Sequence, residues 1–155
     1  MADTYALKNY HAVCQALDQQ NLQYTRHDDN LVVTLGIQGE HAQVTILFHV
    51  DEKRNAVMLL SKLPFDIPED KRVELALYIA AINNHLFAGC FDLDVFSGSI
   101  SFRLATVYAG SVLDKEAYSQ VFAMAVSSID AHSEKLSLLL KGEVSIEQLI
   151  NEMNK

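Results

Sequence analysis

The fold is decided by the stretch PEDKRVELALYIAAINNHLFAGCFDLDVFSGSISFR, residues 68–103. It opens with Pro68, which suits a first helical turn because its missing N–H would have no helical partner there. Apolar residues follow at helical spacing as far as Phe87, and Gly89 can adopt the left-handed conformation that ends many helices. The pattern predicts a helix over residues 68–87.

A β-hairpin is predicted directly after this helix. Residues 91–95 alternate apolar and polar side chains, Ser97-Gly98 supplies a turn, and residues 100–105 alternate again. Such period-two patterns on both sides of a glycine turn are typical of two antiparallel strands with one buried face.

The predicted helix is apolar around most of its circumference. At about 100° per residue, only a narrow stripe is polar. We therefore expect Val73, Leu77 and Phe87 to be buried against a sheet and a second helix. The stripe consists of Lys71, Glu74, Tyr78 and His85.

Asn83 falls near the middle of the apolar arc. Buried amides normally find hydrogen-bond partners, so we expect a structural amide that bonds to nearby backbone. The alternative is an amide that contacts a ligand in a pocket between this helix and the sheet.

The flanking segments complete an α+β domain. We expect a helix at residues 4–20, strands near 31–37, 43–50 and 56–60, a helix from Asp114 to Gly142, and a short helix begun by a Ser145–Gln148 capping box. A short extended segment at Leu22 and Tyr24 precedes these strands. The order is α-β-β-β-α-β-β-α plus a short C-terminal helix. It predicts one domain over residues 1–155, with a five-stranded antiparallel sheet and helices mainly on one face.

The strand at residues 56–60, AVMLL, is apolar on both faces. Other apolar residues also point to the side of the sheet that should face water. A loop or a terminal helix could cover that side, or it could be an interaction surface for a partner or a second copy. The second interpretation assigns partner or dimer binding to Val32, Leu47, Val57, Leu59 and Val107.

Composition excludes several classes of protein. The formal net charge of −8 and pI of about 5.1 argue against a nucleic-acid-binding protein, which needs a basic face. No apolar run approaches the ~18 residues of a membrane span, and residues 1–4 do not begin a signal peptide. We therefore expect a cytoplasmic protein, with Cys14 and Cys90 as reduced thiols.

No set of residues predicts a metal, a cofactor or a catalytic site. The six histidines form no H-x-x-x-H or H-E-x-x-H pattern, and C-x-x-C, P-loop and G-x-G-x-x-G motifs are missing. Asp92 and Asp94 share one strand face, where we expect solvated carboxylates, one of them paired with Arg103. We expect His132 to be a core histidine. The sequence therefore predicts a protein that is not an enzyme.

The chain resembles the YbjN family of bacterial sensory transduction regulators, whose members are similar in fold to type III secretion chaperones. It departs from the family pattern at Ala80, often Asn, and at Ser97, usually acidic. The matching residues are Val50-Asp51, Leu63-Pro64, Pro68, Arg72, Ile82-Asn83, Gly89, Phe91, Leu93-Asp94, Gly98, Ile100, Phe102-Arg103, Gly142 and Ser145.

The resemblance implies a protein-binding module, chaperone-like or adaptor-like, that holds an extended partner segment along its sheet or first helix. Strand addition at a free sheet edge and apolar pockets would be the physical mode. Homodimerisation through the same surface is the expected companion. The alternative function is a small-molecule sensor with a pocket near Asn83.

Overall fold

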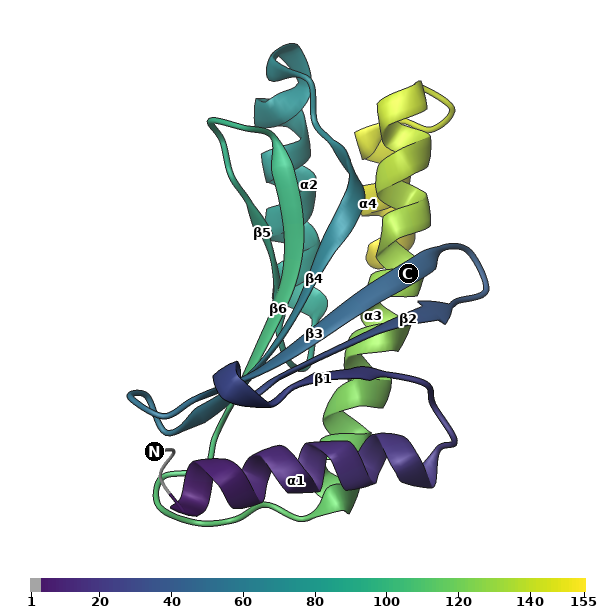
Figure 1. Cartoon of the computed structure of the whole chain (residues 1–155). Helices are drawn as coiled ribbons and strands as arrows, with labels where there is room; N and C mark the ends of the chain where they lie inside the picture. Colours follow the sequence, from purple (N-terminus) through teal and green to yellow (C-terminus); the bar gives the residue numbers. More distant parts are fainter. Residues whose placement is uncertain (1–3) are drawn as a thin grey trace.

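The computed structural model describes residues 4–155 of the chain. The helices, strands and short 3-10 turns (η) follow the predicted order, with one additional strand (Figure 1). The elements are α1 (Thr4–Gln19), β1 (Thr25–His27), η1 (Asp28–Asn30), β2 (Val32–Gln38), β3 (Gln43–Asp51), β4 (Ala56–Asp66), η2 (Glu69–Lys71), α2 (Arg72–His85), β5 (Cys90–Leu93), β6 (Ser99–Val107), α3 (Lys115–Lys141) and α4 (Ile146–Met153).

The strands form one antiparallel sheet in the order β1-β2-β3-β4-β6-β5. It has six strands, so the expected number of five is wrong. The additional strand, β1, pairs with β2 at one edge of the sheet, three residues beyond the start that Leu22 suggested. In Figure 1, α2, α3 and α4 lie behind the strands and α1 lies below them, so the front face of the sheet remains open.

One hydrophobic core fills the space between the sheet and these helices. Alternate strand residues point into it, and Val33, Phe48 and Phe102 are almost completely buried. The rings of Phe91 and Phe102 meet edge to face, with 5.1 Å between their centroids. The quadrupoles of aromatic rings favour this arrangement. The core therefore lies on one face of the sheet, as the order of the elements predicted.

Helix α2 ends at His85, two residues before the predicted end at Phe87. Leu86 already has an extended backbone, and Gly89 comes too late to cap the helix. Gly89 has φ 79°, and a Cβ there would lie 2.5 Å from the Phe102 ring. The glycine is therefore required for a close approach to the core, and its role as a helix stop is a wrong prediction.

The buried face of α2 also differs from the prediction. Tyr78, assigned to the polar stripe, is completely buried, whereas Val73, Leu77 and Phe87 are 78%, 64% and 94% exposed. A helix that is apolar all round does not reveal which side faces the sheet, and contacts with β5 and α4 decide it. The buried residues are Leu75, Tyr78, Ile79 and Ile82.

Asn83 bonds to backbone, as expected of a structural amide. Its Nδ2 donates to the Phe91 carbonyl at 3.0 Å, and its Oδ1 accepts from the Phe91 N–H at 2.8 Å. Both amide groups are thus used to fasten β5 to α2.

Asn9 fastens α1 to the segment before α3 in a similar way. Its side chain is fully buried. Nδ2 donates to the carbonyls of Tyr5 and Ser111, while Oδ1 accepts from the Leu113 N–H at 3.0 Å and from the Tyr118 hydroxyl at 2.7 Å. Four hydrogen bonds satisfy the amide completely, which sequence patterns did not predict.

We expect Asn9→Ala to lower the free energy of unfolding by about 2–4 kcal/mol, because it leaves buried donors without an acceptor. Urea unfolding measures this. Gln15→Ala, at an exposed position on the same helix, is the matched control and should change stability by less than about 0.5 kcal/mol. Equal stability of the two variants would contradict this role of Asn9.

Candidate interaction surfaces

The open face of the sheet carries a continuous group of apolar side chains from four strands. Leu47 on β3 stands opposite Leu60 on β4, and His49 stands between Val32 on β2 and Met58 on β4. Directly opposite pairs on one face lie ~5 Å apart, so these side chains touch or nearly touch. We call this group the open-face patch: Val32, Leu47, Met58, Leu60 and Val107. The first four are partly exposed, and Val107 is 65% exposed.

The five residues predicted for partner or dimer binding lie on both faces of the sheet. Val32, Leu47 and Val107 lie on the open face. Val57 and Leu59 point into the core, where they are 2% and 1% exposed, so their assignment to an exposed surface is wrong. Side chains alternate along a strand, and an apolar run such as AVMLL gives no sign of which set faces water.

An ion pair borders the patch on the β5 side. Arg103 Nε donates to Asp92 Oδ2 at 2.8 Å, which confirms the expected cross-strand pair. The guanidinium holds the pKa of Asp92 below its ordinary value. Burial raises the pKa of the neighbouring Cys90 thiol, so this cysteine is not activated as a nucleophile.

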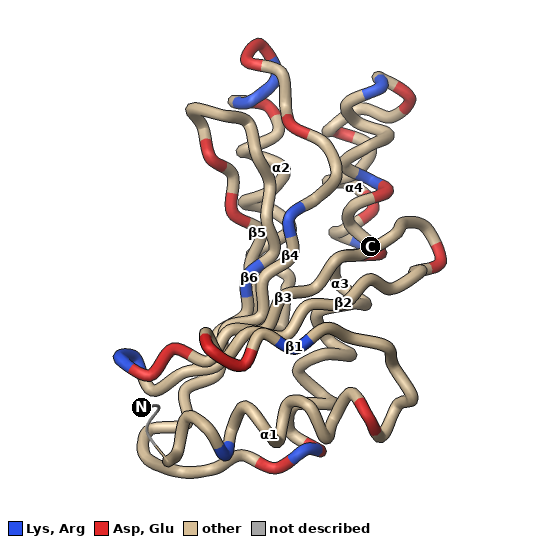
Figure 2. Tube along the Cα trace, in the orientation of Figure 1, with Lys and Arg blue, Asp and Glu red and all other residues tan. Residues whose placement is uncertain are grey.

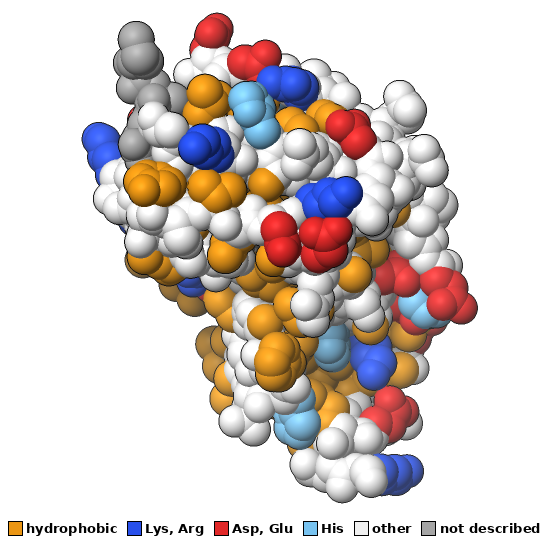
Figure 3. Space-filling model, turned by 90° about the horizontal axis from the view of Figure 1, so that it is seen from below, with side chains coloured by type: hydrophobic (Ala, Val, Ile, Leu, Met, Phe, Trp, Pro, Cys, Tyr) orange, Lys and Arg blue, Asp and Glu red, His pale blue; other side chains and the backbone are white. Residues whose placement is uncertain are grey.

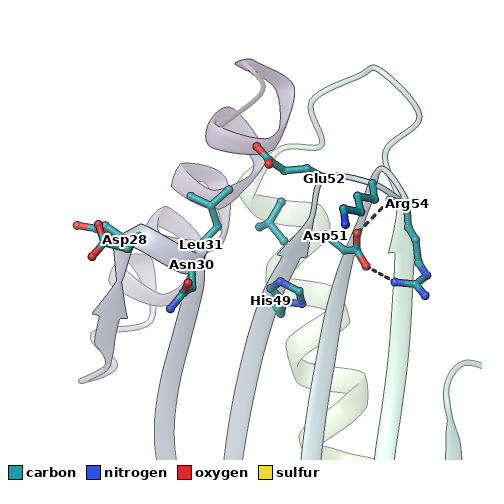
Figure 4. Close-up of a pocket in the computed structure, with 10 residues that line it drawn as sticks. Asp28, Asn30, Leu31, His49, Asp51, Glu52 and Arg54 are labelled. Atoms are coloured by element: carbon teal, nitrogen blue, oxygen red, sulfur yellow. Dashed lines mark hydrogen bonds and ion pairs between the residues drawn. The ribbon is translucent and has the colours of Figure 1, made fainter. Parts of the chain in front are cut away.

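An acidic cavity borders the patch at its other end. It has a volume of about 640 Å³ and lies between η1 and the turn that joins β3 to β4 (Figure 4). Asp51 is held there by Arg54, whose Nη1 lies 2.6 Å from Asp51 Oδ2, and this pair lowers the pKa of Asp51. Figure 2 shows acidic residues at both η1 and this turn. The residues that line the acidic cavity are Asp28, Asp29, Asn30, Leu31, His49, Val50, Asp51, Glu52, Lys53 and Arg54.

A second apolar surface, which the sequence did not predict, lies on the outer side of α2 and the β5–β6 turn. We call it the α2 surface: Val73, Leu77, Val95 and Phe96. The last two are 56% and 91% exposed. These residues, with Glu69, Arg72 and Ala76, line a groove of about 570 Å³. The sequence signal for this surface is the pair Val95 and Phe96, because residues at the tip of a turn are usually polar.

Arg72 fixes the geometry of the α2 surface. Its guanidinium donates to the carbonyls of Ile67, Val95 and Phe96 at 2.8–3.1 Å. It thus holds the β5–β6 turn beside α2, so that Phe96 and Leu77 are presented together.

The outer side of α1 is less continuous. Tyr5 and Leu7 are 44% and 40% exposed. Seen from below, hydrophobic side chains on this side are interspersed with Lys, Arg, Asp, Glu and His (Figure 3).

Glu40, His41 and Asp130 bring potential metal ligands within 4.8 Å of one another. The Asp130 carboxylate, however, already accepts the backbone N–H groups of Glu40, His41 and Ala42 at 2.9–3.1 Å. Burial raises the pKa of Asp130, but these hydrogen bonds outweigh it and hold the pKa below its ordinary value. Asp130 thus joins the β2–β3 turn to α3, a structural role that accounts for its position.

His132 is partly buried at the border of the core, where its ring and that of Phe91 meet edge to face, 5.7 Å between centroids. Its Nδ1 has no hydrogen-bond partner among the described residues. Burial, with a smaller contribution from Lys135, lowers its pKa to about 4. The histidine is therefore neutral at pH 7.

The family model described as "Putative bacterial sensory transduction regulator", YbjN, matches residues 9–150. The chain belongs to the YbjN family. No functionally curated protein matches the sequence. None of the helices in residues 4–155 is both long and apolar enough to span a bilayer.

Solved structures show the same fold as this YbjN-family chain at low sequence identity. YbjN from E. coli is 12% identical, with a TM-score of 0.59 over 83% of this chain and 90% of that one. A chain of the HopA1–SchA chaperone–effector complex is 14% identical, with a TM-score of 0.62 over 87% and 99%. A chain of the ExsC–ExsE complex is 17% identical, with a TM-score of 0.59 over 90% and 97%.

We expect the stability of this protein to fall in acid because of His132. The unfolded state takes up a proton near pH 6.5 and the folded state only near pH 4, so stability is lost as the pH falls between these values. The full pKa difference corresponds to about 3.4 kcal/mol, and partial solvent exposure reduces this to about 1–2 kcal/mol.

Urea unfolding between pH 7 and pH 4.5 measures this loss. His132→Gln should reduce the dependence on pH, whereas His11→Gln, at an exposed position, should leave it unchanged. A wild-type slope in His132→Gln would contradict the assignment.

Proposed function

We propose that this chain is a non-enzymatic protein-binding module, chaperone-like or adaptor-like, that binds an extended segment of a partner polypeptide on the open-face patch. The observation that carries the proposal is the contrast between the two faces of the sheet. Helices cover one face, whereas apolar side chains of β2, β3, β4 and β6 remain partly exposed on the other. Contiguous exposed apolar side chains mark interaction sites in soluble proteins.

The edge of the sheet could also bind the backbone of the partner segment. β1 is an edge strand of three exposed residues, Thr25–His27, and it pairs with β2 on one side only. An edge strand presents N–H and C=O groups that an added strand can pair with, while apolar pockets select its side chains.

The comparisons support this proposal through the fold. Two of the similar structures are complexes whose names include a partner, one of them a chaperone with its effector. A role in regulation, which the family description suggests, would follow if the partner were a regulator. The two free thiols, Cys14 and Cys90, fit the reducing cytoplasm.

The α2 surface supports self-association as a companion property. Four exposed apolar residues form it, and Arg72 holds the turn that carries Val95 and Phe96. Contacts of one surface with its own copy about a two-fold axis are the commonest oligomeric interface. This differs from the dimer through the sheet that the sequence suggested. It leaves the open-face patch accessible in both copies.

A small-molecule sensor is less well supported. The pocket expected beside Asn83 would use its amide, but both amide groups bond to the Phe91 backbone.

We expect the full chain to select binders from a random 12-residue peptide library displayed on phage. Leu60→Asp should weaken the selected peptides at least tenfold, about 1.4 kcal/mol, because a charge replaces an apolar contact. Fluorescence anisotropy of the synthesised peptides measures this. Val112→Asp, a 44% exposed apolar position in the segment after β6, is the control and should bind normally.

Val57→Asp should unfold the protein, since it buries a charge in the core. Selected peptides that bind Leu60→Asp as well as they bind the wild type would contradict the proposal.

We expect the protein to sediment as a dimer and Leu77→Asp to sediment as a folded monomer, because the substitution charges the centre of the α2 surface. Analytical ultracentrifugation with circular dichroism checks both. Val112→Asp should remain dimeric. A dimer that persists in Leu77→Asp would refute this interface.

A further inference from the structure

We propose that the partner segment carries Lys or Arg next to its apolar residues, and that this basic end occupies the acidic cavity beside the open-face patch. The inference rests on the proposed function and specifies the chemistry of the partner.

The cavity and the patch form one surface. His49 lines the cavity and stands between Val32 and Met58 in the cross-strand register of the patch. Figure 4 shows His49 on the strand that leads to Asp51 and Glu52, with Asp28 across the cavity on η1. An extended segment on the patch therefore reaches the cavity within one or two residues, at ~3.3 Å per residue.

The lining of the cavity is negative. Four carboxylates and two cations line it, a formal excess of two negative charges. One of the cations, Arg54, is already paired with Asp51. Another carboxylate, Asp28, is paired with Arg26 at 2.9 Å and accepts the Tyr10 hydroxyl, which hold its pKa below its ordinary value. With Arg26 counted, four carboxylates face three cations, so the site carries one net negative charge, and the lowered pKa values of Asp28 and Asp51 keep these two carboxylates ionised in mild acid.

The shape of the site suits a long basic side chain. Lys and Arg pack their methylene stems on apolar surface while their charged ends reach polar groups. Here the stem would lie on the partly exposed Val32 and Met58 beside His49, and the charged end would face Asp29 and Glu52.

A second copy of this chain is a poorer occupant. Its formal net charge is also −8, and an isologous contact through this face would bring two acidic cavities together. The open face thus favours a cationic segment of another protein.

Sequencing of the peptides that the full chain selects from the 12-residue phage library tests this. The expected result is enrichment of Lys or Arg within about three residues of an apolar pair, together with affinity that falls as salt rises from 50 to 300 mM. The double variant Asp29→Lys/Glu52→Lys should weaken the selected peptides at least tenfold. The neutral variant Asp29→Asn/Glu52→Gln should weaken them less.

Glu143→Lys/Glu147→Lys is the matched control. It makes the same change in net charge at two exposed positions, Glu143 before α4 and Glu147 in its first turn, and should bind as the wild type does. Selected peptides without a basic bias, or equal binding by both reversal variants, would overturn the inference. If Leu60→Asp still removes their binding, the proposed function survives. If Leu60→Asp has no effect, both fail.

Discussion

The antiparallel pairing of β4 with β6 is the constraint on which the rest of the structure depends. It joins the β1–β4 meander to the β5–β6 hairpin and fixes which side chains of β4 face the helices. In this register Leu59 pairs with Leu104 in the core, while Leu60 stands opposite Arg103 on the open face. A slip by one residue would exchange the two faces of the strand. The side chains of the open-face patch and those of the core are therefore set by the same strand pairing.

The structure has two apolar surfaces, which lie on different elements and have different neighbouring groups. The open-face patch is borne on strands and ends at an acidic cavity. The α2 surface is borne on a helix and on a turn that Arg72 clamps through three carbonyls. Under the proposed function, this division lets self-association and partner binding occur together, since neither proposed interface uses the residues of the other. Helix α2 is apolar on most sides without being fully buried, because Val73 and Leu77 on its outer side form part of the exposed α2 surface.

Sequence patterns predicted local structure well where a polar residue has a specific structural role, such as capping a helix. Asp114 caps α3 by accepting from the Ala117 N–H, and Ser145 with Gln148 forms the predicted capping box. The patterns were insufficient where every residue is apolar. The run AVMLL contains no polar side chain to reveal its register, so Val57 was assigned to the wrong face. The acidic cavity was missed because its residues come from two turns that only the β2–β3 pairing brings together.

The central claim is that the open face of the sheet receives the partner. Amide chemical-shift mapping of the ¹⁵N-labelled protein during titration with a library-selected peptide tests it most directly. The account predicts perturbations concentrated in β2, β3, β4 and β6 and in the turns that line the acidic cavity, with α2 unchanged. Perturbations confined to α2 and the β5–β6 turn, with the sheet unaffected, would contradict it.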